Sequence, residues 1–233
     1  MQAIILAGGS GSRLGNLVKN TPKPFLLVNK KPFVLKIVER LTNQGVKKII
    51  FCLGHKPKKI VDFFSDGSKW GVEISYVIED KLMGTAGAVR GAYKNISQSN
   101  VIILNGDSFC YFDIPNLVKQ HQLNRADITI SVLETSNPNR YGLVSFNKKM
   151  KISKFIEKNK NYEDKNYFIN AGVYVIKKSL IKKINENKPE SLEKDFFPSF
   201  LDKNMQAFVI KNKKFIDIGT PESLEKADFF FNK

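Results

Sequence analysis

The chain has 233 residues, of which 42% are hydrophobic, which is enough for the packed core of one domain covering residues 1–233. No apolar run approaches the roughly 18 residues of a membrane helix, and the start of the chain does not resemble a secretion signal. We therefore expect a cytoplasmic protein without a membrane partner. The formal charge of +16 comes mainly from scattered Lys, with few Arg, which argues against nucleic acid as a partner.

Apolar runs of strand length alternate with amphipathic segments of helix length, which predicts βα units around a mainly parallel sheet. The expected strands are residues 2–6, 48–53, 73–78, 101–104, 128–133, 141–146, 151–156 and 168–176. The expected helices are residues 32–44, 58–64, 85–95, 114–124 and a last helix that Thr220 caps. We therefore predict an α/β fold with three layers (αβα), a Rossmann-like arrangement and a small β subregion in the second half.

A glycine-rich loop follows the first expected strand. Residues 6–14 read LAGGSGSRL, and residues 21–25 read TPKPF. Glycine lets the backbone approach phosphate oxygens, and Arg13 and Lys23 add positive charge near the loop. The spacing fits neither the Walker loop nor the dinucleotide fingerprint. Taken alone, this loop is a candidate phosphate site, and an ordinary glycine turn with solvated charges is the alternative.

Together these two segments resemble the first signature of the sugar-phosphate nucleotidyltransferases, in which a GGxGxRL loop is followed by Pro-Lys-Pro. Further matches stand in the family's order at residues 83–88, 104–107, 141–142, 155–158, 170–174 and 215–221. The short chain, residues 192–197 and residues 215–219 are most similar to the heptose 1-phosphate guanylyltransferases. The resemblance covers nearly the whole chain and implies the nucleotide-diphospho-sugar transferase fold.

The resemblance also implies a reaction. A sugar 1-phosphate oxygen attacks the α-phosphorus of a nucleoside triphosphate in line, and pyrophosphate leaves. Both reactants are anionic, so catalysis consists mainly of charge neutralisation and alignment, without a protein nucleophile. Residues 1–110 would bind the nucleotide and residues 111–233 the sugar phosphate, and the nucleotide sugar would serve surface polysaccharide synthesis.

Two carboxylates are candidates for a metal site. Asp107 directly follows an apolar strand, at the sheet edge where open α/β sheets bind ligands, and Asp217 follows a strand-like segment. Each could instead be a helix cap or a turn residue. Mg²⁺ prefers one or two carboxylates together with phosphate oxygens, and in the family the matching pair holds the metal. We therefore expect Mg²⁺ as the cofactor, with Asp107 and Asp217 as ligands.

The family's other functional residues carry over by motif. Arg13 would stabilise the departing pyrophosphate, and Lys23 would balance charge on the α-phosphate. The expected nucleotide-binding residues are Leu6, Ala7, Gly8, Gly9, Gly11, Ser12, Glu79, Gly84, Thr85 and Asn105. The expected sugar-phosphate-binding residues are Tyr141, Gly142, Glu157, Lys158 and Asn170. Lys158 would hold the phosphate, while Glu157 and Asn170 would bind sugar hydroxyls, although Glu-Lys pairs on a basic surface are usually only solvated.

The base is predicted from Glu79. Guanine presents two adjacent donors on its pairing edge, and a carboxylate accepts from both, whereas relatives that use uridine or thymidine nucleotides often have Gln here. GTP is therefore the expected nucleotide, with CTP and UTP as alternatives if Asp80 or the backbone near Gly84 reads the base. A catalytically silent nucleotide-sugar-binding protein is the remaining alternative. The sugar and the oligomeric state, including a homodimer, stay open.

Overall fold

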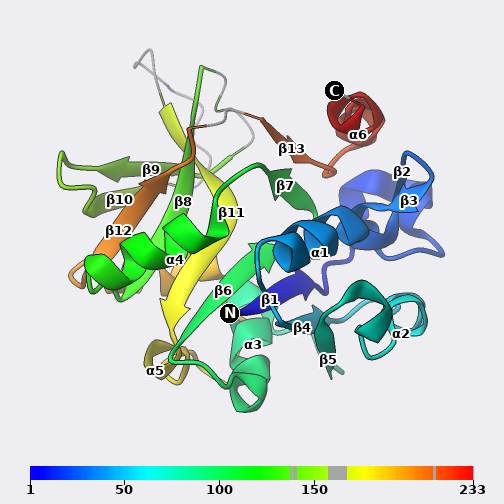
Figure 1. Ribbon diagram of the computed structural model, residues 1–233, viewed down its shortest axis with the longest axis horizontal. Helices are drawn as coiled ribbons and strands as arrows, with labels where there is room; N and C mark the ends of the chain where they lie inside the picture. Colours follow the sequence, from blue (N-terminus) through cyan, green and yellow to red (C-terminus); the bar gives the residue numbers. More distant parts are fainter. Residues whose placement is uncertain (137, 139–140, 157–166, 212–213, 233) are drawn as a thin grey trace.

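The computed structural model describes residues 1–136, 138, 141–156, 167–211 and 214–232 (Figure 1). In this part of the chain, nine strands form the main sheet. They are β1 (Gln2–Ala7), β4 (Lys48–Leu53), β5 (Glu73–Ile78), β6 (Asn100–Asn105), β8 (Ile128–Thr135), β9 (Leu143–Phe146), β10 (Ile152–Ile156), β11 (Tyr167–Lys177) and β12 (Met205–Val209). The other two pairs are β2 (Leu27–Val28) with β3 (Lys31–Pro32) and β7 (Ser108–Cys110) with β13 (Phe215–Asp217).

The order of the sheet divides it into two regions. Strands β5, β4, β1 and β6 are adjacent and parallel. On the other side of β6 the long strand β11 runs antiparallel to it, and β11 also pairs with β8 and β9. The parallel strands therefore end at one common edge. The β8–β12 region beside them forms the predicted β-rich second half, and the α/β fold class is confirmed.

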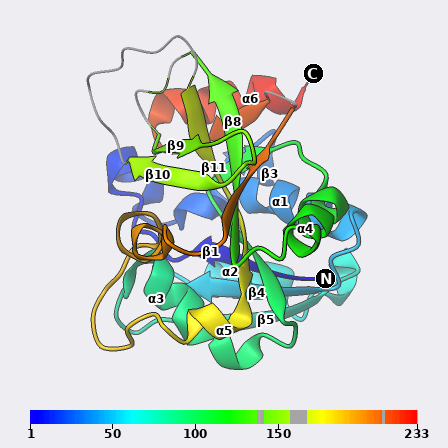
Figure 2. The ribbon, with the colours of Figure 1, turned by 90° about the vertical axis from the view of Figure 1, so that its left-hand side faces the viewer.

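Helices cover both faces of the sheet, which gives the predicted three layers (Figure 2). Alternate strand residues face opposite sides, so Ala3 and Ile5 pack in one apolar cluster and Ile4 packs in the other. The first cluster includes residues of α1 (Phe33–Asn43), α2 (Lys58–Phe64), α4 (Ile114–Leu123) and α6 (Pro221–Phe231). The second includes residues of α3 (Gly84–Gly91) and α5 (Lys178–Ile181).

Local sequence signals account for several helix ends. Thr220 caps α6, where its hydroxyl accepts from the backbone N–H of Ser223 while the Ser223 hydroxyl accepts from the N–H of Thr220. The Asp113 side chain caps α4 by accepting from the backbone N–H of Asn116. The helix expected at residues 85–95 is divided, because α3 ends at Gly91 and a 3₁₀ turn continues from it. No helix in the described ranges is long and apolar enough to cross a membrane.

Candidate active site

A cavity of about 250 Å³ opens where β1, β5 and β6 end. Most of its walls come from residues that the sequence predicted to bind a nucleotide. Its lining comprises Leu6, Gly8, Gly9, Glu79, Leu82, Gly84, Thr85, Ala88, Asn105 and Asp107. Leu82 and Ala88 are the two lining residues that were not predicted from the sequence. The predicted residues Ala7, at the end of β1, and Gly11 and Ser12, at the start of the following 3₁₀ turn, do not line the cavity.

The glycine-rich loop is held closely against the end of β4. A Cβ atom on Gly54 would lie 2.8 Å from the Gly8 carbonyl oxygen, so only glycine allows this approach. The backbone N–H of His55 donates to the same oxygen at 3.3 Å. Further along, Gly11 adopts a left-handed φ of 66° and begins a 3₁₀ turn on which Arg13 is exposed. The loop is therefore fixed at its base while Arg13 extends into solvent.

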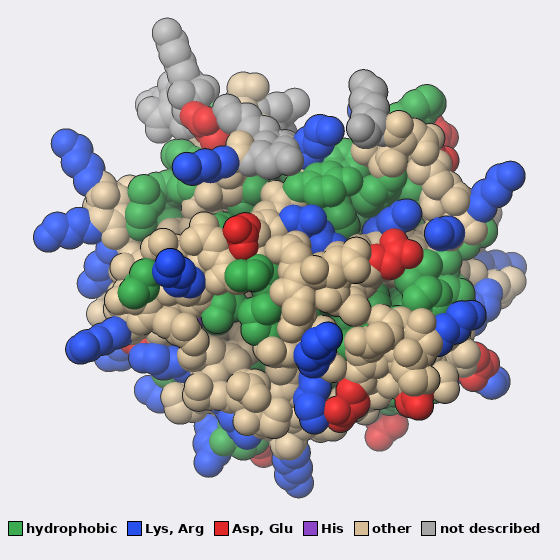
Figure 3. All heavy atoms as spheres, in the orientation of Figure 1, with side chains coloured by type: hydrophobic (Ala, Val, Ile, Leu, Met, Phe, Trp, Pro, Cys, Tyr) green, Lys and Arg blue, Asp and Glu red, His purple; other side chains and the backbone are tan. Residues whose placement is uncertain are grey.

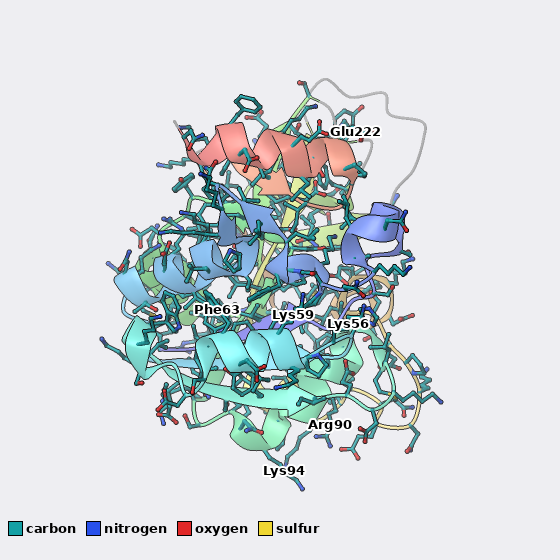
Figure 4. The ribbon with its side chains drawn as sticks, turned by 90° about the vertical axis from the view of Figure 1, so that its right-hand side faces the viewer. Lys56, Lys59, Phe63, Arg90, Lys94 and Glu222 are labelled. Atoms are coloured by element: carbon teal, nitrogen blue, oxygen red, sulfur yellow. The ribbon has the colours of Figure 1, made fainter. Side chains whose placement is uncertain are left out.

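Lys23 is buried although it carries a charge, because it is paired. Its Nζ lies 2.5 Å from Oδ2 of Asp107, and only 7% of the residue is exposed. The segment around Lys23 is supported by α2, on which Lys59 and Phe63 lie (Figure 4). Lys59 donates to the Thr21 hydroxyl at 3.0 Å, and Phe63 packs edge to face on Phe25. The predicted α-phosphate lysine therefore lies beside the predicted metal ligand.

Asp107 and Asp217 are brought together by the small β7–β13 pair. Asp217 is opposite Ser108 in the register, and the backbone N–H of Ile218 donates to the Asp107 carbonyl at 2.9 Å. The Asp217 carboxylate accepts from the Tyr141 hydroxyl at 2.6 Å and from the N–H of Gly219 at 2.8 Å.

These contacts test whether the pair fits a cation. No cluster of three or more acidic, His or Cys side chains suited to a metal occurs among the described residues. Two carboxylates nevertheless match Mg²⁺, because this ion takes one or two carboxylates and completes its coordination with phosphate oxygens and water. Each carboxylate has about four acceptor positions, so the contacts of Asp107 do not use up its capacity.

Glu79 lines the cavity directly after the end of β5. Its Oε1 accepts from the backbone N–H of Met83 at 3.2 Å. Its Oε2 lies close to the glycine-rich loop, because a Cβ atom on Gly8 would be 3.2 Å from it. Burial raises the pKa of this carboxyl above its ordinary value, and the Met83 hydrogen bond opposes that shift. Asp80, the alternative base reader, does not line the cavity.

The predicted sugar-side residues converge only in part. The backbone N–H of Asn170 donates to the Gly142 carbonyl at 2.9 Å, so Asn170 lies beside the Tyr141–Gly142 turn. Tyr141 in turn contacts Asp217, which places this turn next to the carboxylate pair. Glu157 and Lys158 lie outside the described residues.

A polar network that adjoins the cavity through Thr85 was not predicted from the sequence. Glu193 accepts from the hydroxyls of Thr85 and Tyr174, at 3.1 and 3.0 Å respectively. Both Glu193 and Tyr174 lie in motifs that carried the family resemblance, at residues 192–197 and 170–174. Their membership of those motifs was the available signal, but their contact depends on the fold.

The positive charge does not concentrate at one place on the face that Figure 3 shows. Lys and Arg side chains are dispersed there among polar and apolar surface, with acidic side chains between them. This distribution agrees with the Lys-rich composition.

Comparison with known proteins finds matches over the whole chain. Residues 2–233 match the family described as nucleotidyl transferase. D-glycero-α-D-manno-heptose 1-phosphate guanylyltransferase of Aneurinibacillus thermoaerophilus is 34% identical over 229 residues, which cover 97% of this chain and 96% of that enzyme. Mannose-1-phosphate guanylyltransferase of Mycobacterium tuberculosis is 30% identical over 95% of this chain and 62% of its own length. HddC from Yersinia pseudotuberculosis complexed with GMP-PN has a TM-score of 0.86 and 33% identity, with 99% of both chains covered.

Proposed function

The chain belongs to the nucleotidyl transferase family, and we propose that it transfers GMP from GTP to a heptose 1-phosphate, giving a GDP-sugar and pyrophosphate. One observation supports the choice of reaction: Glu79, which follows β5, and Asp107, which follows β6, line the same cavity as the glycine-rich loop, and the loop's strand β1 lies between β5 and β6 in the sheet. The proposed guanine-reading carboxylate and the proposed phosphate-binding loop would then share one cavity of about 250 Å³. The heptose is proposed because the similarity to the heptose enzyme extends over nearly all of both chains.

At the phosphate end, backbone N–H groups of Gly8, Gly9 and Gly11 would face the triphosphate. Lys23 would neutralise charge that builds on the α-phosphate, since it lies beside Asp107 at the cavity edge. Arg13 would stabilise the leaving pyrophosphate, because it is exposed on the turn that directly follows the loop.

Mg²⁺ is the proposed cofactor, with Asp107 and Asp217 as its protein ligands. A bound Mg²⁺ would supply positive charge to the phosphates of both substrates. The β7–β13 pairing and the Ile218 hydrogen bond hold Asp107, which directly precedes β7, close to Asp217 at the end of β13. Tyr141 orients Asp217 through its hydroxyl, which links the metal ligands to the sugar-side turn.

On the sugar side, Tyr141, Gly142 and Asn170 would line the pocket, and Asn170 would bind a sugar hydroxyl. Glu157 and Lys158 are proposed to bind a hydroxyl and the phosphate from outside the described residues. In the reaction, a phosphate oxygen of the sugar substrate forms a bond to the α-phosphorus, and the bond from that phosphorus to pyrophosphate breaks. The division at residues 110 and 111 into nucleotide and sugar halves stays a prediction.

The proposed function is tested by a matrix of GTP, ATP, CTP and UTP against a panel of sugar 1-phosphates, with pyrophosphate release as the measurement. We expect the highest kcat/KM for GTP with a heptose 1-phosphate, and mannose 1-phosphate tests the related activity named by the second relative. Preference for another triphosphate would contradict the assignment of the base. Binding of GTP without turnover of any pair would indicate a silent nucleotide-binding protein.

We also propose a cytoplasmic location, where GTP is available, and a role for the product in surface polysaccharide synthesis. Both proposals follow from the substrates assigned above. Mass spectrometry of nucleotide sugars in cells that lack the protein tests them, because the GDP-sugar should disappear.

A further inference from the structure

A single carboxylate outside the cavity lining contacts Thr85, which lines the cavity, and Tyr174, which in turn contacts Asn170. Glu193 lies in the helical segment Leu192–Phe196, and its Oε2 accepts from the Thr85 hydroxyl at 3.1 Å and from the Ser191 hydroxyl at 2.9 Å. Its Oε1 accepts from the Tyr174 hydroxyl at 3.0 Å. Thr85 lines the nucleotide cavity, whereas Tyr174 leads toward the sugar side.

Tyr174 is the intermediate between Glu193 and the sugar side. Its side chain is fully buried, and its hydroxyl oxygen accepts from the amide Nδ2 of Asn170 at 2.7 Å. Asn105, whose side chain slightly lowers the pKa of this hydroxyl, lines the nucleotide cavity. Burial, followed by the nearby Glu193 charge, raises the pKa of Tyr174 well above its ordinary value, so the hydroxyl keeps its proton.

The charge of Glu193 determines the direction of these hydrogen bonds. An ionised carboxylate has no donor, so the hydroxyls of Thr85 and Tyr174 must both donate to it. The Tyr174 oxygen is then left as an acceptor, which requires Asn170 to present its NH₂ group. The oxygen of the same amide accepts from the N–H of Gly172 at 3.0 Å, so the Asn170 amide is held at both ends.

Backbone contacts hold the Glu193 segment against the nucleotide side. The backbone N–H of Leu192 donates to the Thr85 hydroxyl at 2.7 Å, and the N–H of Ala86 donates to the Glu190 carbonyl at 2.9 Å. Gly84 has a left-handed φ of 75°, and a Cβ atom there would lie 2.3 Å from the backbone carbonyl oxygen of Glu190. The start of α3 is therefore packed closely against residues 190–192.

We propose that Glu193 is a positioning residue for both substrates, which orders Thr85 directly and Asn170 through Tyr174. The inference rests on the proposed function, because it assigns Thr85 to the nucleotide and Asn170 to the sugar phosphate. Loss of the Glu193 charge therefore weakens the positioning of both substrates. Loss of the Thr85 hydroxyl affects mainly the nucleotide, and loss of the Tyr174 hydroxyl affects mainly the sugar phosphate.

The test compares Glu193→Gln, Tyr174→Phe and Thr85→Val with the wild type by initial rates of pyrophosphate release. GTP and heptose 1-phosphate are varied separately. The matched control is Asp195→Asn, since this neighbouring carboxylate accepts from the Ser191 backbone at 2.7 Å and contacts neither Thr85 nor Tyr174. Thermal melting of each variant is measured alongside.

We expect Glu193→Gln to raise the KM of both substrates roughly tenfold, because an amide cannot accept all of these hydroxyl hydrogen bonds. Tyr174→Phe should raise mainly the KM of the sugar phosphate, and Thr85→Val mainly that of GTP. Asp195→Asn should leave both KM values unchanged. The inference is overturned if Glu193→Gln behaves like Asp195→Asn, or if it changes only one of the two KM values.

If Glu193→Gln does not fold, the Tyr174→Phe and Thr85→Val variants are combined. Two groups that share Glu193 should give coupled effects on kcat/KM, so a double variant whose loss equals the product of the single losses would overturn the inference. Failure of the proposed function is distinguishable, because it is seen in the wild type as absence of turnover with GTP. The comparison is then made with the triphosphate and sugar phosphate that the wild type uses.

Discussion

Replacement of Glu79 by Gln tests how the base is selected. The Oε1 atom of Glu79 accepts from the Met83 N–H at 3.2 Å, and a Gln side chain would keep its oxygen there, because an amide NH₂ cannot accept. The NH₂ group would then replace Oε2, on the side of the cavity near Gly8. The substitution therefore exchanges an acceptor for a donor at the place where, in the proposed binding mode, guanine would present its own donors.

The size of the effect follows from one unpaired polar group. Leaving a donor without an acceptor in a partly buried site costs about 1 to 3 kcal/mol, which corresponds to roughly ten- to hundredfold in kcat/KM. We expect Glu79→Gln to lose this much activity with GTP and to gain activity with UTP, whose carbonyl can accept from the new amide. The assay is pyrophosphate release with each triphosphate at a fixed sugar 1-phosphate concentration.

Asp80→Asn is the matched control, because it removes the neighbouring carboxylate without changing the lining of the cavity. This control should retain the GTP preference. The reasoning is refuted if Glu79→Gln leaves the ratio of GTP to UTP activity unchanged, or if the wild type already prefers a pyrimidine triphosphate.

Four further predictions concern the phosphates, the backbone and stability. Asp107→Asn and Asp217→Asn should each abolish most turnover while the circular dichroism spectrum is retained, and near-normal rates with Mg²⁺ in both would exclude the metal assignment. Arg13→Ala should lower kcat more than it changes KM, since its charge is proposed to stabilise the departing pyrophosphate, and a change in KM alone would argue against that role. Gly84→Ala should lower the free energy of unfolding in urea by about 1 to 3 kcal/mol and weaken GTP binding, because Gly84 has a φ of 75° and contacts Glu190. An unchanged free energy of unfolding would show that alanine is not strained at this position. His121 is buried, and desolvation lowers its pKa to about 4. Between pH 6.5 and 4 the unfolded chain therefore binds more protons than the folded protein, so the free energy of unfolding should fall as the pH falls through this window. The expected loss at pH 5 is about 2 kcal/mol in urea unfolding, relative to pH 7.5, and a His121→Gln variant that shows the same loss would exclude His121 as its source.

The order and type of most elements could be predicted from the sequence, because periodicity and caps are local properties. Strand β1 and helix α2 agree with the apolar pattern to within a residue, and Thr220 caps α6 as expected. Strand β12 was not predicted. Its five residues carry a weak alternation, and it is a strand because it adds to the edge of β8 in parallel register.

The candidate site was predictable where one motif supplies neighbouring residues, as in the glycine-rich loop and in Glu79 before Gly84. The sequence also indicated by itself which residue types were available: two aspartates after strands, a lysine near the loop and a carboxylate suited to guanine. The burial of Lys23 appears only in the structure. The sequence did not indicate that Lys23 is paired with Asp107, because 84 positions separate them.

Only the tertiary structure decided which of these groups meet. Asp107 and Asp217 are neighbours because β7 and β13 pair, and Tyr141 reaches Asp217 because the sugar-side turn packs beside that pair. Glu193 contacts Thr85 and Tyr174 across 108 and 19 positions of chain. Hydrogen bonds and ion pairs act over a few ångströms whatever the separation along the chain, so the residue types follow from the sequence, while their contacts follow from the register of the strands and the packing of the layers.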